Sequence, residues 1–392
     1  MDRNFLQQSF QVRFEYKVFF TEKLFDTANP LFHDYLSSQQ TDNRKKLLFI
    51  IDSGIADHYP ALTAQIKNYL GDIPSFSLAG SPIIIPGGEQ SKNDAQAFDK
   101  ITEAVHQYGI DRHSYIVGIG GGSLLDIAGY AAAVSHRGIR HIRIPTTVLS
   151  QNDSGIGVKN GINFFEKKNF LGTFALPAVV FNDSDFLNTL NERHWRSGIS
   201  EAIKVALIKD PVFFQWLEEN AGLLSQRNMA AMKYLVKRCA ELHLQHIAGG
   251  DPFEMGSSRP LDFGHWSAHK LEQLTHFSVL HGEAVAMGIV LDSVYSFLSG
   301  KITEDEITRI IALITRLGFA LTHPQMMIID KDSPLMAGMN EFREHLGGKL
   351  TIMLLQAIGR GEEVHELDLQ LLKRSSDWIN KNRMAWTPLR DN

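Results

Sequence analysis

Short apolar runs alternate with helical patterns through the first half of the chain, and this alternation constrains the fold more than any other feature. Five of the runs have the length of buried strands, at residues 47–52, 83–85, 115–119, 142–145 and 178–181. Helical spacing of apolar residues separates them, at residues 55–70, 92–108 and 123–135. Strands that alternate with helices form a parallel sheet that is buried on both faces. We therefore expect a Rossmann-like α/β domain in the first half of the chain.

A further strand pattern precedes this region. Val12, Phe14, Tyr16 and Val18 alternate with polar residues between positions 11 and 19. A period of two residues is typical of a strand that buries one of its faces. The pattern predicts an antiparallel edge strand or one strand of a hairpin.

The sequence pattern changes after residue 182. Helical periodicity dominates there, at residues 192–209, 229–247, 261–274, 283–298 and 304–317. The apolar run at residues 350–358 fits either a strand or a buried helix. A chain of 392 residues suits two to three domains at roughly 150 residues each. We expect an α/β domain at residues 1–182 and an all-α domain at residues 183–392.

Composition narrows the classes of function. The chain has 39 basic and 44 acidic residues, a formal net charge of −5, and so offers no general field that would attract nucleic acid. Cys239 is the only cysteine and can form no intramolecular disulfide, which is typical of a reducing compartment. No signal-peptide pattern opens the chain, and the most apolar windows, 114–134 and 282–298, carry acidic residues. We therefore expect a cytoplasmic protein without a membrane span.

A glycine-rich turn follows the apolar run at residues 115–119. Gly120, Gly121 and Gly122 precede Ser123 and Asp126 where a strand should end and a helix should begin. Glycines let the backbone approach a pyrophosphate, and a helix N-terminus supplies free N–H groups with a partial positive charge. Because the full G-x-G-x-x-G spacing is missing, a nucleotide site and a tight structural turn both remain open.

Residues 144–163 form a polar, glycine-rich stretch that predicts neither a strand nor a helix. The stretch contains Asp153 and Lys159, and Lys168 follows it. Long loops between ordered elements are usually functional. With Arg137, the two lysines could give a phosphorylated substrate several charge-assisted hydrogen bonds. A solvated basic loop is the alternative.

Acidic and histidine residues in three segments indicate a metal site. His265 and His269 are four residues apart and would share one face of a helix, with Asp262 one turn earlier. Glu201 lies in another segment of helical pattern, and His281 lies just ahead of a third. Imidazoles and a carboxylate are the ligands of an open Zn²⁺ site. Histidines that cap helices or hydrogen-bond inside the core are the alternative.

In this order, the segments resemble the dehydroquinate synthase-like sugar phosphate cyclases, from about residue 45 to residue 359. The motifs lie at residues 87–92, 120–126, 137–138, 144–147, 185–190, 200–204, 263–265 and 281–283, and at Asp153, Lys159, Lys168, Asn169 and His269. The resemblance implies a dehydroquinate synthase-like fold. In that fold the α/β domain binds NAD, the helical domain carries a divalent metal such as Zn²⁺ or Co²⁺, and the substrate lies between them.

The resemblance also implies roles for individual residues. The metal ligands would be Glu201, His265 and His281. The NAD contacts would be Asp52, Glu89, Lys92, Gly120, Gly121, Gly122, Ser123, Asp126, Thr146, Thr147, Phe186 and Thr189. The substrate and catalytic positions would be Asp153, Lys159, Lys168, Asn169, Lys204, His243, Asp262 and His269, with Arg137 reaching the phosphate from the other subunit of a homodimer.

Two of the substrate positions depart from dehydroquinate synthases. His243 stands where that family usually has a lysine, and Asp262 replaces an asparagine. Both changes make the pocket less cationic, which disfavours a substrate that carries a carboxylate as well as a phosphate. The sequence is most similar to the EboD-like branch of the family, with features of the 2-epi-5-epi-valiolone synthases.

The activity that the resemblance implies is that of a 3-dehydroquinate synthase-like carbon-oxygen lyase. A phosphorylated sugar would be oxidised by NAD⁺, lose phosphate, be reduced again and close to a carbocycle by an intramolecular aldol step. A metal-dependent glycerol or alcohol dehydrogenase is one alternative, although its neutral substrate would not need Lys159, Lys168 and Arg137. A catalytically silent member of the family that acts as a binding partner is the other.

Overall fold

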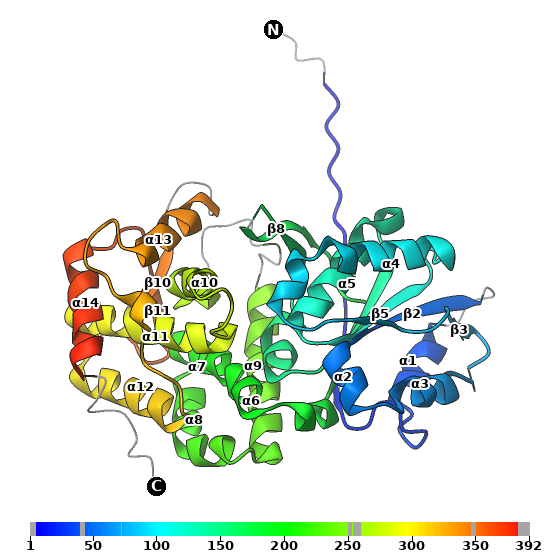
Figure 1. The fold of residues 1–392 in the computed structure, drawn as a ribbon, viewed down its shortest axis with the longest axis horizontal. Coiled ribbons are helices and arrows are strands. Elements are labelled where there is room, and N and C mark those ends of the chain that lie inside the picture. The colour runs from blue at the N-terminus through cyan, green and yellow to red at the C-terminus, as the bar shows by residue number, and fades with distance from the viewer. Residues whose placement is uncertain are drawn as a thin grey trace.

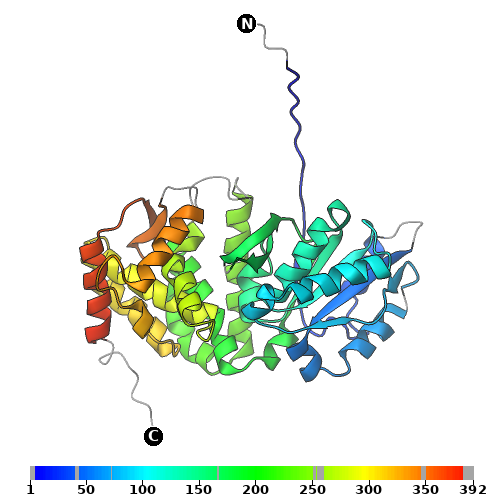
Figure 2. The same ribbon diagram turned by 45° about the horizontal axis from the view of Figure 1, so that its top comes forward.

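The chain folds into two halves that lie side by side, one built on a sheet and the other mostly from helices (Figure 1). Figure 2 shows the same arrangement from a second direction. This computed structural model describes residues 5–39, 44–71, 73–165, 167–249, 253, 260–345 and 350–382. None of the described helices combines the length and the apolarity that crossing a bilayer requires.

A seven-stranded sheet forms the centre of the first half. Its strands are β1 Val18–Thr21, β2 Lys45–Asp52, β3 Phe76–Leu78, β4 Ile83–Ile85, β5 Tyr115–Gly120, β6 Arg140–Pro145 and β9 Val179–Asp183. They run in the order β1-β9-β6-β5-β2-β3, with β4 also paired to β2. Every one of these pairings is parallel. The predicted parallel sheet is therefore confirmed, and its five predicted strands are β2, β4, β5, β6 and β9.

Helices cover both faces of the sheet. They are α1 Leu31–Ser38, α2 Ser53–His58, α3 Leu62–Gly71, α4 Ala95–Gln107 and α5 Gly122–Val134, with short 3-10 turns η1 Glu89–Asn93 and η2 Ser135–Arg137. Leu47 and Phe49 of β2 pack with α1, α2 and α3. Leu48 and Ile50 point to the opposite face and pack with α4 and α5. Because both faces are buried, the strands read as continuous apolar runs.

The single helix predicted at residues 55–70 is two helices. α2 ends at His58 and α3 begins at Leu62, on either side of Pro60. Tyr59 takes φ −122° and ψ 69°, because the proline ring disfavours a helical conformation in the residue before it.

The strand predicted at residues 11–19 is shorter than expected and runs differently. Only β1 pairs, and it lies parallel to β9 with Val18 opposite Val180. The antiparallel prediction is wrong, since alternation reveals a buried face and not the direction of the neighbouring strand. Residues 5–15, called the arm below, project from the body with Phe10, Val12 and Phe14 exposed.

The polar stretch at residues 144–163 has more regular structure than predicted. A π-helical turn, η3 Ser150–Ser154, follows β6, and β7 Lys159–Phe164 then pairs antiparallel with β8 Lys167–Phe174. The prediction of neither strand nor helix is wrong, because the glycines here allow close pairing. A Cβ on Gly161 would lie 2.9 Å from the carbonyl oxygen of Leu171 on the partner strand.

The second half is largely helical. Its longer helices are α6 Glu192–Ser197, α7 Ile199–Lys209, α8 Pro211–Ser225, α9 Met229–Ala248, α10 His265–Leu274, α11 His281–Leu298, α12 Glu304–Arg316, α13 Pro334–His345 and α14 Leu369–Asn382. Short turns lie at η4 Ser184–Thr189, η5 Pro260–Asp262 and η6 Pro324–Met326. The run at 350–358 is a strand, since β10 Ile352–Ala357 pairs with β11 Arg360–Val364. This hairpin is the exception to the predicted all-α character.

Helix α11 is the central helix of this half, and its glycines let other segments approach closely. A Cβ on Gly288 would overlap the carbonyl oxygen of Gly264, which lies just before α10, and would lie 2.9 Å from Ser267 Oγ. Gly264 has a φ of 77°, a left-handed conformation that favours glycine. The close crossing of α10 and α11 therefore depends on two glycines that face each other.

We expect Gly288→Ala to lower the free energy of unfolding by about 3 kcal/mol, because the added methyl group forces the two helices apart. Urea denaturation followed by circular dichroism measures the change. Gly222→Ala in α8 is the matched control, since no atom lies within 4 Å of its Cβ position. The control should be neutral or stabilising by up to about 1 kcal/mol, and equal losses in both variants would contradict the packing argument.

Candidate functional site

The candidate site lies where the carboxyl ends of the parallel strands meet the helical half. The turn η3, which follows β6, packs against α7 and α9, and η4, which follows β9, packs against α2. The predicted NAD residues leave this same edge, after β2, β4, β5, β6 and β9. Ligands of open parallel sheets bind at this edge.

The glycine turn presents the start of α5. Gly121 is the N-cap residue and has no side chain to accept a hydrogen bond from the first turn. The first N–H groups of α5 are therefore available to an anion. A Cβ on Gly122 would lie 2.5 Å from Ser154 Oγ, and one on Gly121 would lie 3.3 Å from Thr147 Cγ2. Close packing against η3 thus also requires glycine, so the structure supports both interpretations of the turn.

The other predicted NAD residues after these strands are partly engaged in the fold. The Asp52 carboxylate accepts a hydrogen bond from Gly54 N (2.8 Å) and caps α2. Thr146 donates its backbone N–H to the carbonyl of Gly120 (3.0 Å). Phe186 is buried in the apolar core and meets the Tyr59 ring edge-on at 5.6 Å. Thr189 donates its hydroxyl to the Phe186 carbonyl (2.8 Å). The Phe186 side chain therefore supports the fold.

A network of charges lies beside the glycine turn. The buried Lys92 ammonium donates to Asp126 Oδ2 (2.8 Å) and to the Asn169 side chain, and it lies 3.8 Å from Glu89. Ser123 Oγ donates to Glu89 Oε2 (3.2 Å). Burial raises the pKa of Asp126 in spite of Lys92. The structure thus brings five of the predicted residues together and pairs them with one another.

Three side chains from three helices converge on the candidate metal centre. Glu201 lies on α7, while His265 and His281 are the first residues of α10 and α11. His265 Nε2 and His281 Nε2 lie 3.6 Å and 3.4 Å from Glu201 Oε1. One potential ligand atom from each residue lies within 4.8 Å of the other two.

The environment of Glu201 fits a cation. Both carboxylate oxygens are buried, and neither accepts a hydrogen bond of good geometry from a described residue. The Lys204 ammonium forms an ion pair with Oε2. Burial opposes the charge, but Lys204 and His265 hold the pKa of Glu201 well below its usual value. Lys204 already supplies one cation, and carboxylate oxygens that are buried without a well-formed hydrogen bond are suitable ligands for a second.

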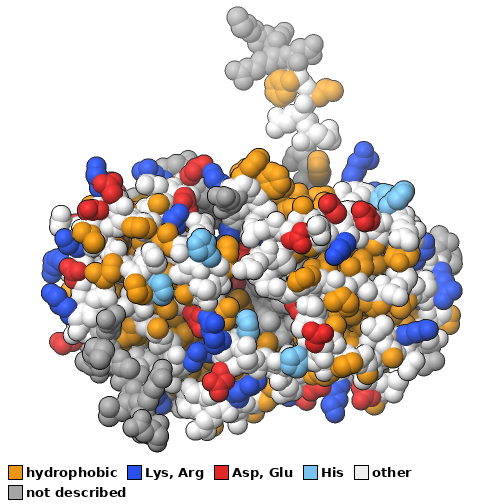
Figure 3. Space-filling model, in the orientation of Figure 1, with side chains coloured by type: hydrophobic (Ala, Val, Ile, Leu, Met, Phe, Trp, Pro, Cys, Tyr) orange, Lys and Arg blue, Asp and Glu red, His pale blue; other side chains and the backbone are white. Residues whose placement is uncertain are grey.

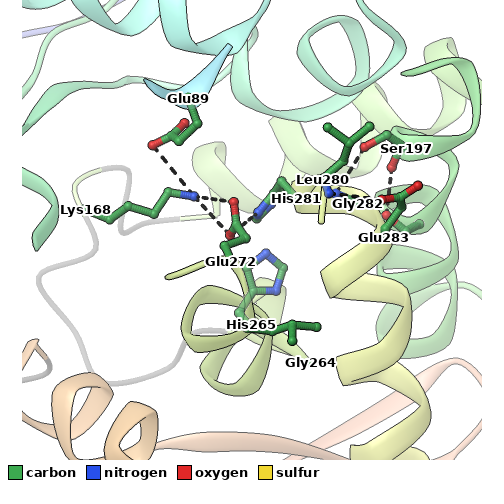
Figure 4. Close-up of polar contacts among 12 residues, drawn as sticks. Glu89, Lys168, Ser197, Gly264, His265, Glu272, Leu280, His281, Gly282 and Glu283 are labelled. Carbon is green, nitrogen blue, oxygen red and sulfur yellow. Dashed lines mark hydrogen bonds and ion pairs between the residues drawn. The ribbon is translucent and has the colours of Figure 1, made fainter. Parts of the chain in front are cut away.

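Each imidazole is held so that its Nε2 faces Glu201. His265 donates Nδ1–H to the Phe263 carbonyl (3.1 Å), and His281 donates Nδ1–H to Glu272 Oε2 (2.9 Å; Figure 4). Burial and the Lys204 charge lower the pKa of His265 to about 4. Burial opposes charge on His281 as well, but Glu272 raises its pKa to about 9. Metal-binding histidines are commonly oriented through their second nitrogen in this way.

Asp262 is placed differently from the prediction. It ends the turn η5, and Gly264 then breaks the backbone before α10 begins at His265. Asp262 therefore does not share a helix face with His265, and that prediction is wrong. His265 and His269 do lie together on α10, with ring centroids 5.3 Å apart.

Two more of the predicted substrate residues lie next to the metal centre. His243 Nδ1 is 2.9 Å from Asp153 Oδ1. Burial opposes the Asp153 charge, but the Lys204 ammonium outweighs it and lowers the pKa of Asp153. The Lys204 ammonium therefore stabilises the ionised forms of both Asp153 and Glu201.

The remaining predicted substrate residues are cationic and lie on or near the β7–β8 hairpin. The Lys168 ammonium is held by Glu272 at 2.9 Å and 3.0 Å, whereas Lys159 is exposed at the start of β7. Arg137 is exposed in η2, beyond the far end of α5 from the glycine turn. A helix of 13 residues separates them by about 20 Å, so the structure does not bring Arg137 to the site of its own chain.

Sequence reasoning missed Glu272 and Arg143. Glu272 follows His265 and His269 at helical spacing, on the same face of α10. Arg143 is fully buried on β6 and donates to the carbonyls of Gly155 (3.1 Å) and Gly157 (2.7 Å) and to Asn160 Oδ1 (2.6 Å). The sequence signal that could have revealed Arg143 is a charged residue inside an apolar strand pattern. Arg143 anchors the segment that joins Asp153 to β7.

Comparisons with known proteins agree with this geometry. Residues 82–197 match the family model for the N-terminal part of 3-dehydroquinate synthase, and residues 198–338 match the model for its C-terminal part. A 3-dehydroquinate synthase of Shewanella sp. (strain MR-4) is 35% identical over 320 residues, which are 81% of this chain and 86% of that protein.

Solved structures show the same fold. ValA, a 2-epi-5-epi-valiolone synthase from Streptomyces hygroscopicus subsp. jinggangensis 5008 with NAD⁺ and Zn²⁺ bound, is 29% identical with a TM-score of 0.85. That match covers 96% of this chain and 100% of the other. A 2-deoxy-scyllo-inosose synthase complexed with carbaglucose-6-phosphate, NAD⁺ and Co²⁺ is 22% identical with a TM-score of 0.74, and covers 91% and 95%. The predicted fold class is confirmed.

We expect Arg143→Met to lower the free energy of unfolding by about 3 kcal/mol or more, because several buried acceptors lose their donor together. Arg140→Met on the same strand is the matched control, since the exposed Arg140 interacts through its side chain with Tyr115, by a hydrogen bond to Oη (2.9 Å) and a contact over the ring. The control should lose less than about 1 kcal/mol. Urea denaturation compares the two, and similar losses would contradict the anchoring role.

The buried carboxyl group of Asp292 should make the stability of the protein depend on pH. Its carboxylate accepts hydrogen bonds from Gly264 N and Trp266 Nε1, both at 3.0 Å, and so holds the start of α10. Burial raises the pKa of Asp292 from 3.8 to about 7. The folded state therefore binds this proton more tightly, and the stability that the group contributes falls as the pH rises from about 4 through about 7.

We expect the stability of the wild type relative to Asp292→Asn to fall by up to about 4 kcal/mol between pH 4 and pH 7. Urea denaturation of both proteins across this range measures the difference, because other titrating groups cancel in the comparison. A difference that does not change with pH would contradict the raised pKa.

Proposed function

The chain belongs to the 3-dehydroquinate synthase family, and on that premise we propose that it is an NAD- and metal-dependent sugar phosphate cyclase. Its reaction would convert a phosphorylated sugar into a carbocycle with loss of phosphate, which makes it a carbon-oxygen lyase. The observation that carries the proposal is the buried Glu201 carboxylate, which faces two oriented imidazoles and has no hydrogen-bond donor of good geometry among the described residues.

We assign the two cofactors to the two halves of the chain. Residues 183–392 would hold a divalent metal, Zn²⁺ or Co²⁺, through Glu201, His265 and His281. Residues 1–182 would hold NAD at the uncapped start of α5, where Gly121 and Gly122 leave room for a pyrophosphate. When bound, the metal polarises a substrate hydroxyl and NAD⁺ takes the hydride from its carbon.

The charged side chains would bind the substrate and move its protons. Burial opposes the charge of Lys204, but Glu201 and Asp153 raise its pKa above the usual lysine value. Lys204 therefore stays protonated and can donate to a substrate oxygen. Burial, and then the Lys168 charge, hold the pKa of His269 well below its usual value, so its imidazole is neutral and can accept a hydrogen bond from a substrate hydroxyl.

The substrate should carry no charge besides its phosphate. His243 pairs with Asp153, so this position supplies no free cation for a second anionic group. Asp262, on the adjacent turn η5, adds a carboxylate to the same region. A substrate carboxylate would be repelled here. A heptulose phosphate fits better than a carboxylated sugar phosphate.

We further propose a cytoplasmic homodimer. The exposed Phe10 and Phe14 of the arm and the exposed Phe170 of β8 are apolar side chains that a subunit contact would bury. Figure 3 shows apolar side chains along the arm and where it meets the body. A second subunit would also bring its Arg137 to the substrate phosphate, together with Lys159. The net charge of −5 fits a small-molecule partner better than nucleic acid.

Incubation of the purified protein with NAD⁺, Zn²⁺ or Co²⁺ and a heptulose phosphate should release inorganic phosphate without net formation of NADH. Glu201→Gln should abolish phosphate release together with metal binding, because it removes an ionised ligand. The exposed Glu219→Gln on α8 is the matched control and should behave as the wild type.

The other functions give different results in the same assay. A glycerol or alcohol dehydrogenase would accumulate NADH with a neutral polyol, without phosphate release. A silent binding partner would show no turnover with any heptulose phosphate, even if calorimetry detects NAD⁺ and metal. Either result would overturn the proposed cyclase.

A further inference from the structure

Glu272 is a buried carboxylate that contacts both halves of the molecule. Only 1% of its surface is exposed. Its Oε2 accepts the Nδ1–H of His281 at 2.9 Å, and the Lys168 ammonium donates to both of its oxygens at 2.9 Å and 3.0 Å (Figure 4). The resemblance to sugar phosphate cyclases assigned no role to Glu272.

The contact with His281 selects the tautomer that a metal requires. When a metal ion displaces the Nε2 proton, an imidazole that donates Nδ1–H presents the lone pair of Nε2 to it. His281 Nε2 then faces Glu201 Oε1 at 3.4 Å. The ring is the first side chain of α11 and keeps about a fifth of its surface exposed. A fixed partner at Nδ1 therefore determines its orientation as well as its proton.

The contact with Lys168 reaches across to the sheet half. Lys168 belongs to β8, whereas Glu272 belongs to α10. The same ammonium lies 3.8 Å from Glu89 Oε1, and Glu89 accepts the Ser123 hydroxyl at the start of α5. A continuous series of contacts thus joins His281, Glu272, Lys168 and Glu89, and it links the candidate metal centre to the glycine turn.

Burial makes the members of this series depend on one another. A buried carboxylate that loses its cation destabilises the fold by several kcal/mol. Lys168 is itself mostly buried, so its charge is screened little by solvent. Without Lys168, Glu272 would lose the donor that holds both of its oxygens in place, and the His281 ring would lose its fixed orientation.

We propose that Glu272 positions His281 for metal binding and that Lys168 clamps Glu272 to Glu89, so that metal affinity depends on a lysine of the sheet half. This inference rests on the proposed function, in which Glu201, His265 and His281 hold the metal. Lys168 then acts as a positioning residue rather than as a direct ligand of the substrate.

The dissociation constant of Zn²⁺, measured by competition with a chromophoric chelator, tests the inference without a substrate. We expect Glu272→Gln and Lys168→Met each to weaken Zn²⁺ binding about 10- to 100-fold, as loss of an oriented second-layer partner does elsewhere. Lys168→Arg keeps the cation and should recover part of the affinity. The double variant should lose little more than either single variant, because both break the same series.

Lys167→Met is the matched control. Lys167 is the neighbouring lysine on β8, is exposed, and pairs with Glu344 at 3.2 Å. Its removal takes the same charge from the same hairpin, so it should leave the Zn²⁺ dissociation constant within about twofold. The visible spectrum of the Co²⁺ form adds a second readout, which should change in Glu272→Gln and not in Lys167→Met.

The outcomes separate this inference from the proposed function. If Glu201→Gln and His265→Ala leave Zn²⁺ binding intact, the metal lies elsewhere and both ideas fail. If those two variants lose Zn²⁺ but Lys168→Met binds it as tightly as the wild type, only the proposed role of Lys168 is overturned. The proposed function then stands. The Lys168 variants keep this test decisive even if Glu272→Gln does not fold.

Discussion

The buried carboxylate of Glu201 is the constraint on which the arrangement of the second half depends. It is ionised, fully buried and short of hydrogen-bond donors, so its charge must be balanced by neighbours. Lys204 supplies part of the balance from the next turn of α7. The imidazoles of His265 and His281 complete the surroundings, and their helices reach this point because glycines permit α10 and α11 to cross closely. The close packing of α10 against α11 therefore also places the imidazoles next to Glu201.

Family membership establishes the fold, whereas the substrate has to be inferred from individual side chains of the site. The matches to both parts of 3-dehydroquinate synthase establish the fold and the family, and solved relatives carry NAD⁺ with Zn²⁺ or Co²⁺. We propose that the choice of substrate depends on a few side chains beside the candidate metal centre. His243 Nδ1 lies 2.9 Å from Asp153 Oδ1, so the two side chains at this position contact each other. Side chains at such a position can differ between relatives that share one fold.

The spacing of apolar residues predicted the elements whose formation depends on local burial. The five central strands and most helices follow from runs and periods of apolar residues, because burial on one or both faces fixes those patterns. The β7–β8 hairpin did not follow, because its polar, glycine-rich residues lack the apolar pattern of a strand. The direction of β1 did not follow either, since it depends on a partner distant in sequence. Arg143 and Glu272 were missed for the same reason. Their roles arise from acceptors and donors in other elements, which composition and spacing alone do not reveal.

The three proposed ligands come from the separate helices α7, α10 and α11, and this affects the order of assembly. Helices α8 and α9 separate Glu201 from the two histidines in the sequence, so we expect that a partly folded chain does not hold Glu201 beside either of them. A metal ion can be captured only after the tertiary packing is complete. Binding would then lock a finished core instead of nucleating one, unlike the small zinc domains that are unfolded without their ion.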